Sequence, residues 1–171
     1  EVRQRDLVKN ALRMRPERII LGEVRGDEAF DMLQAMNTGH DGSLATIHAN
    51  SPRDALARLE NMVAMTGMDL PAKMVHAQIA SAINAVVQVA RLEDGRRRLL
   101  SLAEIQGMEG DVITMSEIFA FRRQGLDEAG RVVGALKATG VVPVFYDTLK
   151  SRGIAPPPTV FSVSGDYQAE G

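Results

Sequence analysis

A short apolar run that ends in a glycine and a glutamate restricts the fold of this chain more than any other feature. Residues 19–21, Ile-Ile-Leu, are followed directly by Gly22 and Glu23. A consecutive run of this length, rich in β-branched side chains, is typical of a strand buried on both faces of a parallel sheet. The pattern then predicts a helix over residues 26–39 and a second buried strand over residues 43–48.

This strand–helix–strand order is typical of a parallel sheet, so the chain is predicted to be an α/β protein. Ligands bind such sheets at the carboxyl ends of the strands. Glu23 ends the first predicted strand and His48 ends the second. We therefore expect both side chains on the same rim of the sheet.

The remainder of the chain predicts packing helices followed by an antiparallel extension. Apolar strands flank the turn Glu93-Asp94-Gly95-Arg96 and the glycine-bounded segment 125–130, which is a hairpin pattern. Three consecutive prolines in IAPPPTV are expected to exclude regular structure. Helices are predicted over residues 6–14 with Asp6 as the cap, 51–65, 71–83 and, as a last C-terminal helix, 143–152.

Composition is that of an ordinary globular domain and argues against several classes of protein. The chain has 171 residues, of which 45% are hydrophobic and 25% charged, with a net charge of -2. That balance provides no uniform field to recruit nucleic acid or an anionic membrane. Cysteine is absent, which excludes disulfides and thiolate sites, and no apolar stretch approaches the roughly 20 residues of a membrane span.

The chain is expected to be a fragment, because it opens on Glu1 in an amphipathic pattern rather than on methionine. Residues 1–153 are predicted to form one domain. Residues 154–171 are predicted to be a proline-rich, disordered tail whose last eight residues, SGDYQAEG, fray.

Glu23 and His48 have the chemistry that nucleotide hydrolysis requires at the end of a sheet. A rigidly held carboxylate can orient or deprotonate water near Mg²⁺ and a γ-phosphate, and an imidazole can donate to a phosphate oxygen. Each residue also has a plain structural interpretation. Glu23 can simply enter a charged loop, and His48 can close its strand by bonding a loop carbonyl.

Other polar residues near these strands have more than one interpretation. His40 lies in the sequence Gly-His-Asp-Gly, which is also a good turn. A zinc site from His40, Asp41 and His48 is disfavoured, because no further ligand lies at zinc-type spacing. Four arginines lie near Glu23 in the sequence: Arg13, Arg15, Arg18 and Arg25. They would either clamp or sense a phosphate or pair with neighbouring acidic residues. Arg25 is expected to lie closest to the site.

Two groups farther along the chain are interpreted as structural. His76 lies on a predicted helix and is expected to be solvated or at an interface rather than a ligand. The run 96–98, three arginines at a hairpin, is expected to be a solvated edge that discourages sheet pairing, with contact to a partner or to lipid as the alternative.

Residues 13–62, which contain both predicted strands, resemble a known protein family. RMRPERIILGEVRGDEAFDMLQAMNTGHDGSLATIHANSPRDALARLENM resembles the secretion ATPases of the type II/IV superfamily, in detail the CpaF-like branch of Tad (Flp) pilus assembly. The resemblance continues through LPAKMVHAQIASAINAVVQVARLEDGRRRLLSLAEIQGMEGDVITMSEIFAF to about Gly153. It therefore covers nearly the whole chain apart from the tail.

The resemblance implies the C-terminal portion of a RecA-like P-loop NTPase core, with a parallel sheet flanked by helices. It implies a cytoplasmic homo-hexamer, peripheral at an inner-membrane platform, that uses ATP and Mg²⁺. Glu23 falls on the Walker B carboxylate, and residues 39–50 form the His box with His48 at the phosphate-contacting position. The further nucleotide-binding or phosphate-sensing candidates are Gly22, Arg25, His40 and Thr46, and no direct metal ligand is expected.

One element of such a motor is missing from the sequence. No G-x-x-x-x-G-K-[ST] phosphate loop occurs, so the chain alone is expected to hydrolyse ATP negligibly. A non-catalytic assembly module remains the alternative. A nucleic-acid translocase is disfavoured, because there is no basic aromatic stripe and only seven aromatic residues (five Phe, two Tyr) occur.

Overall fold

The computed structural model describes residues 1–163, and these form two compact units. Unit 1 comprises residues 1–84 and 107–113, and unit 2 comprises the other described residues, 85–106 and 114–163. The stretch predicted as one domain, 1–153, is therefore divided between two units. The expected fraying of SGDYQAEG lies outside the described residues.

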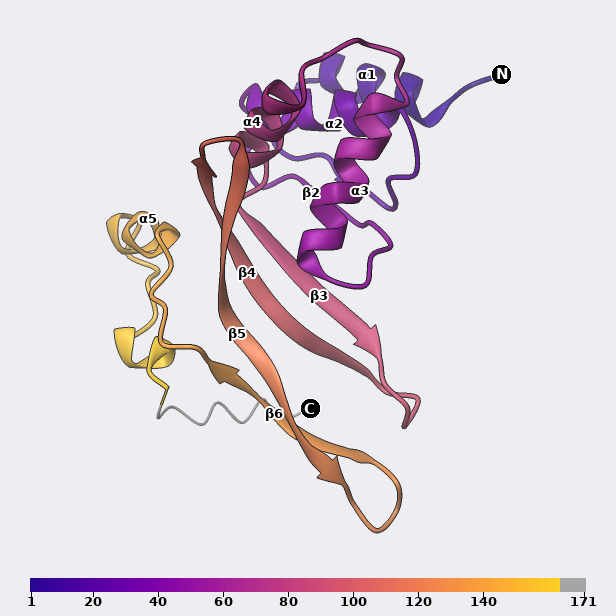
Figure 1. The fold of residues 1–171 in the computed structure, drawn as a ribbon. Coiled ribbons are helices and arrows are strands. Elements are labelled where there is room, and N and C mark those ends of the chain that lie inside the picture. The colour runs from indigo at the N-terminus through magenta and orange to yellow at the C-terminus, as the bar shows by residue number, and fades with distance from the viewer. Residues whose placement is uncertain (164–171) are drawn as a thin grey trace. The chain divides into compact units, whose positions relative to one another are not determined.

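Unit 1 is built on two short parallel strands joined by a helical crossover. β1 (Ile20–Leu21) pairs with β2 (Leu44–Ala45), and α2 (Glu28–Asn37) connects them (Figure 1). The predicted strand–helix–strand unit and its parallel pairing are confirmed. Gly39, with φ of 93°, lies just past the end of α2, where a left-handed residue ends a helix.

The prediction that both strands are buried on both faces is wrong. Ile20 and Leu44 are register partners, and their exposed fractions are 72% and 61%. Leu21 points to the opposite face and is 7% exposed. Because this sheet has only two strands among the described residues, most of it stays open: both residues of β2 are exposed, and only Leu21 of the paired residues is buried.

Three further helices pack around α2, which contacts each of them. They are α1 (Gln4–Arg13), α3 (Pro52–Ala64) and α4 (Ala72–Ala82), all close to their predicted ranges. Ser51 caps α3 by accepting a hydrogen bond from the Asp54 amide at 3.1 Å. Asp6 is not the N-cap of α1 as predicted. It lies in the first turn and accepts from the amide of Arg3, which occupies the cap position.

The core of unit 1 lies between these helices and the sheet. Most of its side chains come from the apolar stripes of the helices, as the 3.6-residue periodicity predicts, and Val24 comes from the segment between β1 and α2. Burial of these side chains is the main stabilising contribution to the unit. The most buried are Val24, Ala29, Leu33, Val63 and Ile79.

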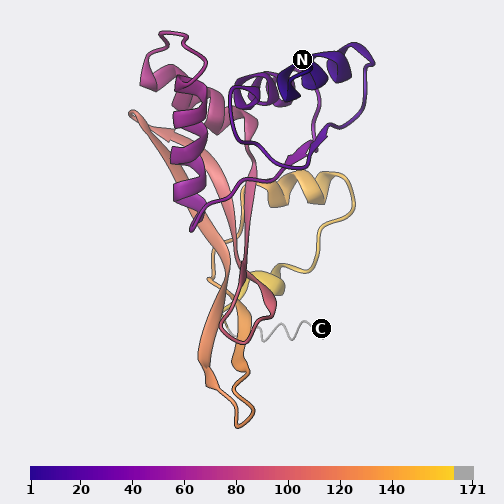
Figure 2. The same cartoon turned by 90° about the vertical axis from the view of Figure 1, so that its right-hand side faces the viewer.

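Unit 2 is a four-stranded antiparallel sheet in the order β3-β4-β5-β6. The hairpins predicted around residues 93–96 and 125–130 are confirmed, with the observed turns between β3 and β4 and between β5 and β6, whereas the turn between β4 and β5 was not predicted. Its Gly110, at φ of 61°, supplies the left-handed conformation of that turn. Figures 1 and 2 show the long strands side by side; they are β3 (Ala85–Arg91), β4 (Arg97–Glu109), β5 (Val112–Leu126) and β6 (Val132–Ala138).

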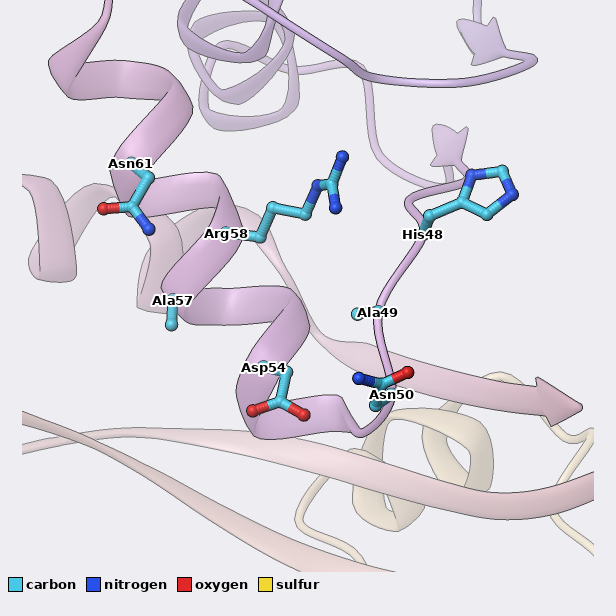
Figure 3. A pocket seen from close by; sticks show the side chains of 7 residues that line it. All are labelled: His48, Ala49, Asn50, Asp54, Ala57, Arg58 and Asn61. Atoms are coloured by element: carbon cyan, nitrogen blue, oxygen red, sulfur yellow. The ribbon is translucent and has the colours of Figure 1, made fainter.

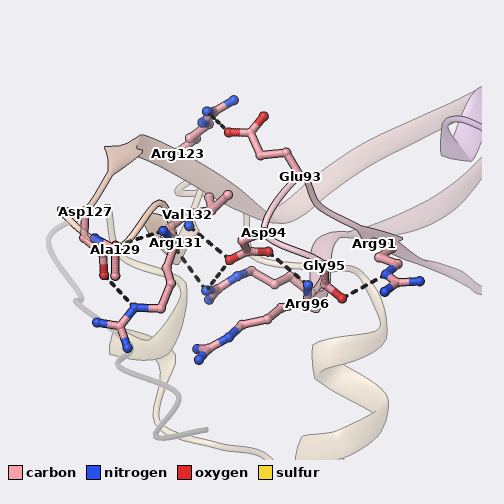
Figure 4. A network of polar contacts seen from close by, with 11 residues as sticks. Arg91, Glu93, Asp94, Gly95, Arg96, Arg123, Asp127, Ala129, Arg131 and Val132 are labelled. Carbon is pink, nitrogen blue, oxygen red and sulfur yellow. Dashed lines mark hydrogen bonds and ion pairs between the residues drawn. The ribbon is translucent and has the colours of Figure 1, made fainter.

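The arginine run at the first hairpin is not a uniformly solvated edge. Arg98 donates to the carbonyl of Val132 at 3.0 Å, approaches Asp94 at 3.6 Å and lies over the ring of Phe121. Asp94 accepts from the amides of Arg96 and Val132, each at 3.0 Å (Figure 4). These bonds connect the β3–β4 turn to the start of β6, so Arg98 is structural while its neighbours in the run are exposed.

The segment after β6 packs on unit 2 instead of forming a loose tail from residue 154. The predicted last helix is present as α5 (Phe145–Ser151), whose first amides donate to the buried carboxylate of Glu104. A short 3₁₀ helix, η1 (Pro158–Phe161), follows, so the expectation that the prolines exclude regular structure is wrong. Proline has the φ that begins such a helix, and buried Phe161 contacts the ring of Phe119.

Candidate functional site

The carboxyl ends of β1 and β2 lie side by side and continue to bond beyond the two strands. The Thr46 amide donates to the Leu21 carbonyl at 3.3 Å, and the Val24 amide donates to the Thr46 carbonyl at 2.9 Å. The Thr46 hydroxyl also donates to the carbonyl of Gly22. These bonds hold the two strand ends in a fixed relation.

Glu23 and His48 meet at this rim, as the sequence predicted. Nδ1 of His48 lies 2.7 Å from Oε1 of Glu23, and the Arg25 guanidinium donates to Oε2. An ionised carboxylate only accepts hydrogen bonds, so Nδ1 carries the proton and Nε2 remains available for another partner. We call these three residues, Glu23, Arg25 and His48, the carboxylate triad.

The electrostatics of the carboxylate triad keep Glu23 ionised. The hydrogen bond from Arg25 lowers the pKa of the Glu23 carboxyl below its ordinary value, and the bond to His48 lowers that pKa further. The same contact raises the pKa of Arg25. Each carboxylate oxygen keeps lone-pair directions beyond those in use, so Glu23 can still accept a hydrogen bond from water. A lowered pKa makes it a better orienting acceptor than a proton-abstracting base.

The backbone around Glu23 is anchored by Gln4 and Glu28, neither of which was predicted as a site residue. The Gln4 side chain donates to the Glu23 carbonyl at 2.7 Å. The buried carboxylate of Glu28 accepts from the amides of Arg25 and Gly26 at 2.7 and 3.1 Å. A glutamate in the first turn of a helix is the signal that would have indicated Glu28, whereas nothing local indicates Gln4.

The other predicted site residues divide between the rim and nearby turns. Gly22 and Thr46 lie at the strand ends and bond each other. Nδ1 of His40 lies 3.2 Å from the Ala35 carbonyl, and the His40 carbonyl accepts from the Ser43 hydroxyl, which matches the turn interpretation. Of the four candidate arginines only Arg25 is bonded to Glu23, while Arg18 lies 4.0 Å from Glu17.

A shallow pocket of about 290 Å³ opens beside the triad. One wall is the segment that follows β2, from His48 to Asn50, and the other is a face of α3 that carries Arg58 (Figure 3). α3 was predicted only as a packing helix, so its outer face was not predicted to border a site. The polar spacing of Asp54, Arg58 and Asn61 along the helix is the signal that would have indicated it.

The site offers few ligands to a metal ion. Within residues 1–163 no group of three or more His, Asp or Glu side chains could hold one. Mg²⁺ is usually bound through one or two carboxylates, several waters and the phosphates of a substrate, and the triad supplies a single carboxylate that is already bonded to Arg25 and His48. These residues alone therefore do not fit a resident Mg²⁺. No helix in the described part of the chain is both long and apolar enough to cross a bilayer.

The fold and the site define a mixed α/β protein with a small parallel sheet and a four-stranded antiparallel sheet. It is structurally similar to the VirB11 ATPase of the Brucella suis type IV secretion system, solved in complex with sulphate. The TM-score is 0.55 at 33% sequence identity, and the match covers 59% of this chain and 31% of that one. The chain belongs to the Type II/IV secretion system protein family, whose model matches residues 1–144.

Similar curated proteins carry related descriptions. A putative conjugal transfer protein of Mycobacterium tuberculosis is 46% identical over 155 residues, which are 91% of this chain and 40% of that protein. The type IV secretion system protein PtlH of Bordetella pertussis is 43% identical over 101 residues, 57% of this chain and 30% of that protein. The chain thus spans less than half the length of these relatives. They do not single out the CpaF-like branch expected from the sequence.

Proposed function

We propose that this chain is the C-terminal portion of a RecA-like motor domain in an ATPase that drives type II/IV secretion or conjugal transfer. Membership of the family and the carboxylate triad at the ends of β1 and β2 support this proposal. The single observation that carries it is the bond between Glu23 and His48. Two residues that are 25 positions apart in sequence form one acid–imidazole pair where α/β sheets bind their ligands.

In this proposal Glu23 orients the water that attacks the terminal phosphate. Arg25 and His48 keep the carboxylate charged and fix its direction, while the bond from Gln4 restrains its backbone. Nε2 of His48 faces away from Glu23, and in the imidazolium form of the ring it donates to a phosphate oxygen. ATP would supply the transferable phosphoryl group, and Mg²⁺ would be held chiefly by its phosphates and would neutralise their charge.

The intact protein is proposed to work as a homo-hexamer on the cytoplasmic side of an inner-membrane platform. Similarity to a VirB11 ATPase and to relatives described as conjugal transfer or type IV secretion proteins supports this class of machine. Tad pilus assembly by a CpaF-like enzyme is the finer form of the proposal. It predicts that deleting the gene abolishes pili, and normal piliation with lost conjugation would contradict it.

The test of the catalytic role is Glu23→Gln in the intact protein. We expect nucleotide binding to remain within about threefold, while turnover falls by about a hundredfold or more, because the neutral amide aligns water poorly. Phosphate release and the binding of a fluorescent ATP analogue measure the two effects. Glu17→Gln is the matched control, since Glu17 is 94% exposed and lies outside the triad.

Two outcomes would change the assignment. Unchanged turnover in Glu23→Gln would remove Glu23 from its proposed role. An intact wild-type protein that assembles but neither binds nor hydrolyses ATP would favour the non-catalytic assembly module instead.

A further inference from the structure

The face of α3 that borders the pocket carries polar side chains that make no hydrogen bond or ion pair with other residues of the described chain. Asp54, Arg58 and Asn61 follow each other at helical spacing, so they lie along one side of the helix. Asn50 faces them from the segment after β2 (Figure 3). Within residues 1–163, the side chains of Arg58, Asn50 and Asn61 have neither a hydrogen bond nor an ion pair.

The orientation of Arg58 is the informative part of this arrangement. Asp54 lies four residues earlier on the same helix, the spacing at which an ion pair forms readily. No such pair is present; the Arg58 side chain extends away from Asp54 and toward the side of the pocket where His48 lies (Figure 3). The guanidinium charge is therefore not neutralised within the described chain.

The charge balance of the rim favours an anion at this end of the pocket. The negative charge of Glu23 is already paired with the positive charge of Arg25, so Glu23 does not compensate the charge of Arg58 as well. Guanidinium, imidazole and carboxamide groups are all hydrogen-bond donors, and the guanidinium fork matches two oxygens of a phosphate. Asp54, at the opposite end of the helix face, repels an anion and so restricts it to the Arg58 end.

We propose that Arg58, with the carboxamides of Asn50 and Asn61, forms a phosphate-binding subsite next to the carboxylate triad. This inference rests on the proposed function in one respect, namely that the phosphate belongs to a nucleotide. Arg58 then holds the outermost phosphate against Nε2 of His48 while Glu23 orients water. The helix α3 thereby becomes part of the nucleotide site rather than a packing element only.

In the first test, calorimetry measures the binding of inorganic pyrophosphate to the 171-residue chain. We expect the wild type to bind pyrophosphate and Arg58→Ala to weaken binding about tenfold or more, since charge-assisted bonds to phosphate are lost. Arg58→Lys should lose less, because it keeps the charge without the fork. Arg53→Ala is the matched control, an exposed arginine on the same helix that does not line the pocket.

Three results would overturn the subsite. They are no pyrophosphate binding by the wild type, equal binding by Arg58→Ala and wild type, or equal losses in Arg58→Ala and Arg53→Ala. Circular dichroism of each variant checks that α3 is retained. Because Arg58 is exposed and unbonded, its removal is expected to leave the fold intact.

The second test separates this inference from the proposed function in the intact protein. Arg58→Ala should weaken ATP binding about tenfold while ADP binding changes little, because only ATP has the outermost phosphate. Equal losses for ATP and ADP would contradict that placement. If pyrophosphate binding depends on Arg58 but the intact protein does not turn over ATP, the subsite is retained and the proposed function is rejected. If ATP turnover depends on Glu23 but not on Arg58, the proposed function is retained and the subsite is rejected.

Discussion

Individual side chains in this protein take their roles from neighbours that are distant in sequence. Arg98 belongs to a run of three arginines, yet it alone lies over Phe121 and bonds the Val132 carbonyl. Glu23 is likewise one of many glutamates until His48 and Arg25 bond its two oxygens. In both cases the local sequence indicates the residue type, and the tertiary contact decides what the residue does.

Gly134 is likewise constrained by residues of a neighbouring strand, because they leave no room for a side chain at its position. A Cβ there would lie 2.5 Å from Cζ of Phe121 and 2.7 Å from the carbonyl oxygen of Arg122. Gly134→Ala is therefore expected to destabilise the protein by about 1–3 kcal/mol, because the clash involves backbone that cannot move aside. Urea denaturation followed by circular dichroism measures the change.

Gly22→Ala is the control for that prediction. Nothing lies within 4 Å of a Cβ added at Gly22, so stability should not fall. A Gly134→Ala protein as stable as the wild type would mean that β5 and β6 adjust more freely than their paired register indicates.

At the scale of elements, α3 and α4 are joined to the tip of the β4–β5 hairpin through His76. Nε2 of His76 lies 3.1 Å from the Glu60 carboxylate on α3, and Nδ1 lies 2.6 Å from the Asp111 carbonyl at the tip. Lys73 of α4 pairs with the Asp111 carboxylate at 3.0 Å. His76 was expected to be solvated or at an interface, and it instead bonds two other elements of unit 1.

These contacts predict a pH-dependent contribution to stability. The Asp111 carbonyl and then the Glu60 carboxylate raise the pKa of His76 above its ordinary value of 6.5. A group whose pKa is raised by folding stabilises fully below its unfolded pKa, and the contribution is lost as pH rises through the folded pKa. His76→Gln should therefore lower stability more at about pH 5.5 than at about pH 8.5.

Denaturation curves at both pH values measure this difference. Lys73→Gln removes a partner of Asp111 whose charge does not change over that range, so its effect should be similar at the two pH values. Equal effects of His76→Gln at both pH values would show that the imidazole does not donate from both nitrogens in the folded protein.

For the whole molecule, the candidate site lies entirely in unit 1, and the chain covers 40% of the Mycobacterium tuberculosis relative. No G-x-x-x-x-G-K-[ST] motif occurs in its 171 residues. The lysine and amides of that loop hold the phosphates in P-loop ATPases. We therefore predict that the chain by itself releases negligible phosphate from ATP, even if it binds pyrophosphate.

A phosphate-release assay on the isolated chain measures this. Turnover comparable to that of the intact protein would contradict the prediction and would require another phosphate-binding element in these residues. The matched comparison is the same assay on the chain with Glu23→Gln, which distinguishes turnover at this site from contamination.

The sequence by itself determined the kind, order and approximate ends of most elements, from the parallel pair to two antiparallel hairpins, but not the turn between β4 and β5 or the 3₁₀ helix η1. It also indicated that Glu23 and His48 share a rim. These features follow from apolar periodicity, caps, turns and topology, which are encoded over short stretches of chain. The tertiary structure alone decided that Ile20 is exposed, that Arg98 is structural and that Arg58 borders the pocket beside His48. Burial and pairing depend on which distant segments meet, and no local pattern specifies that.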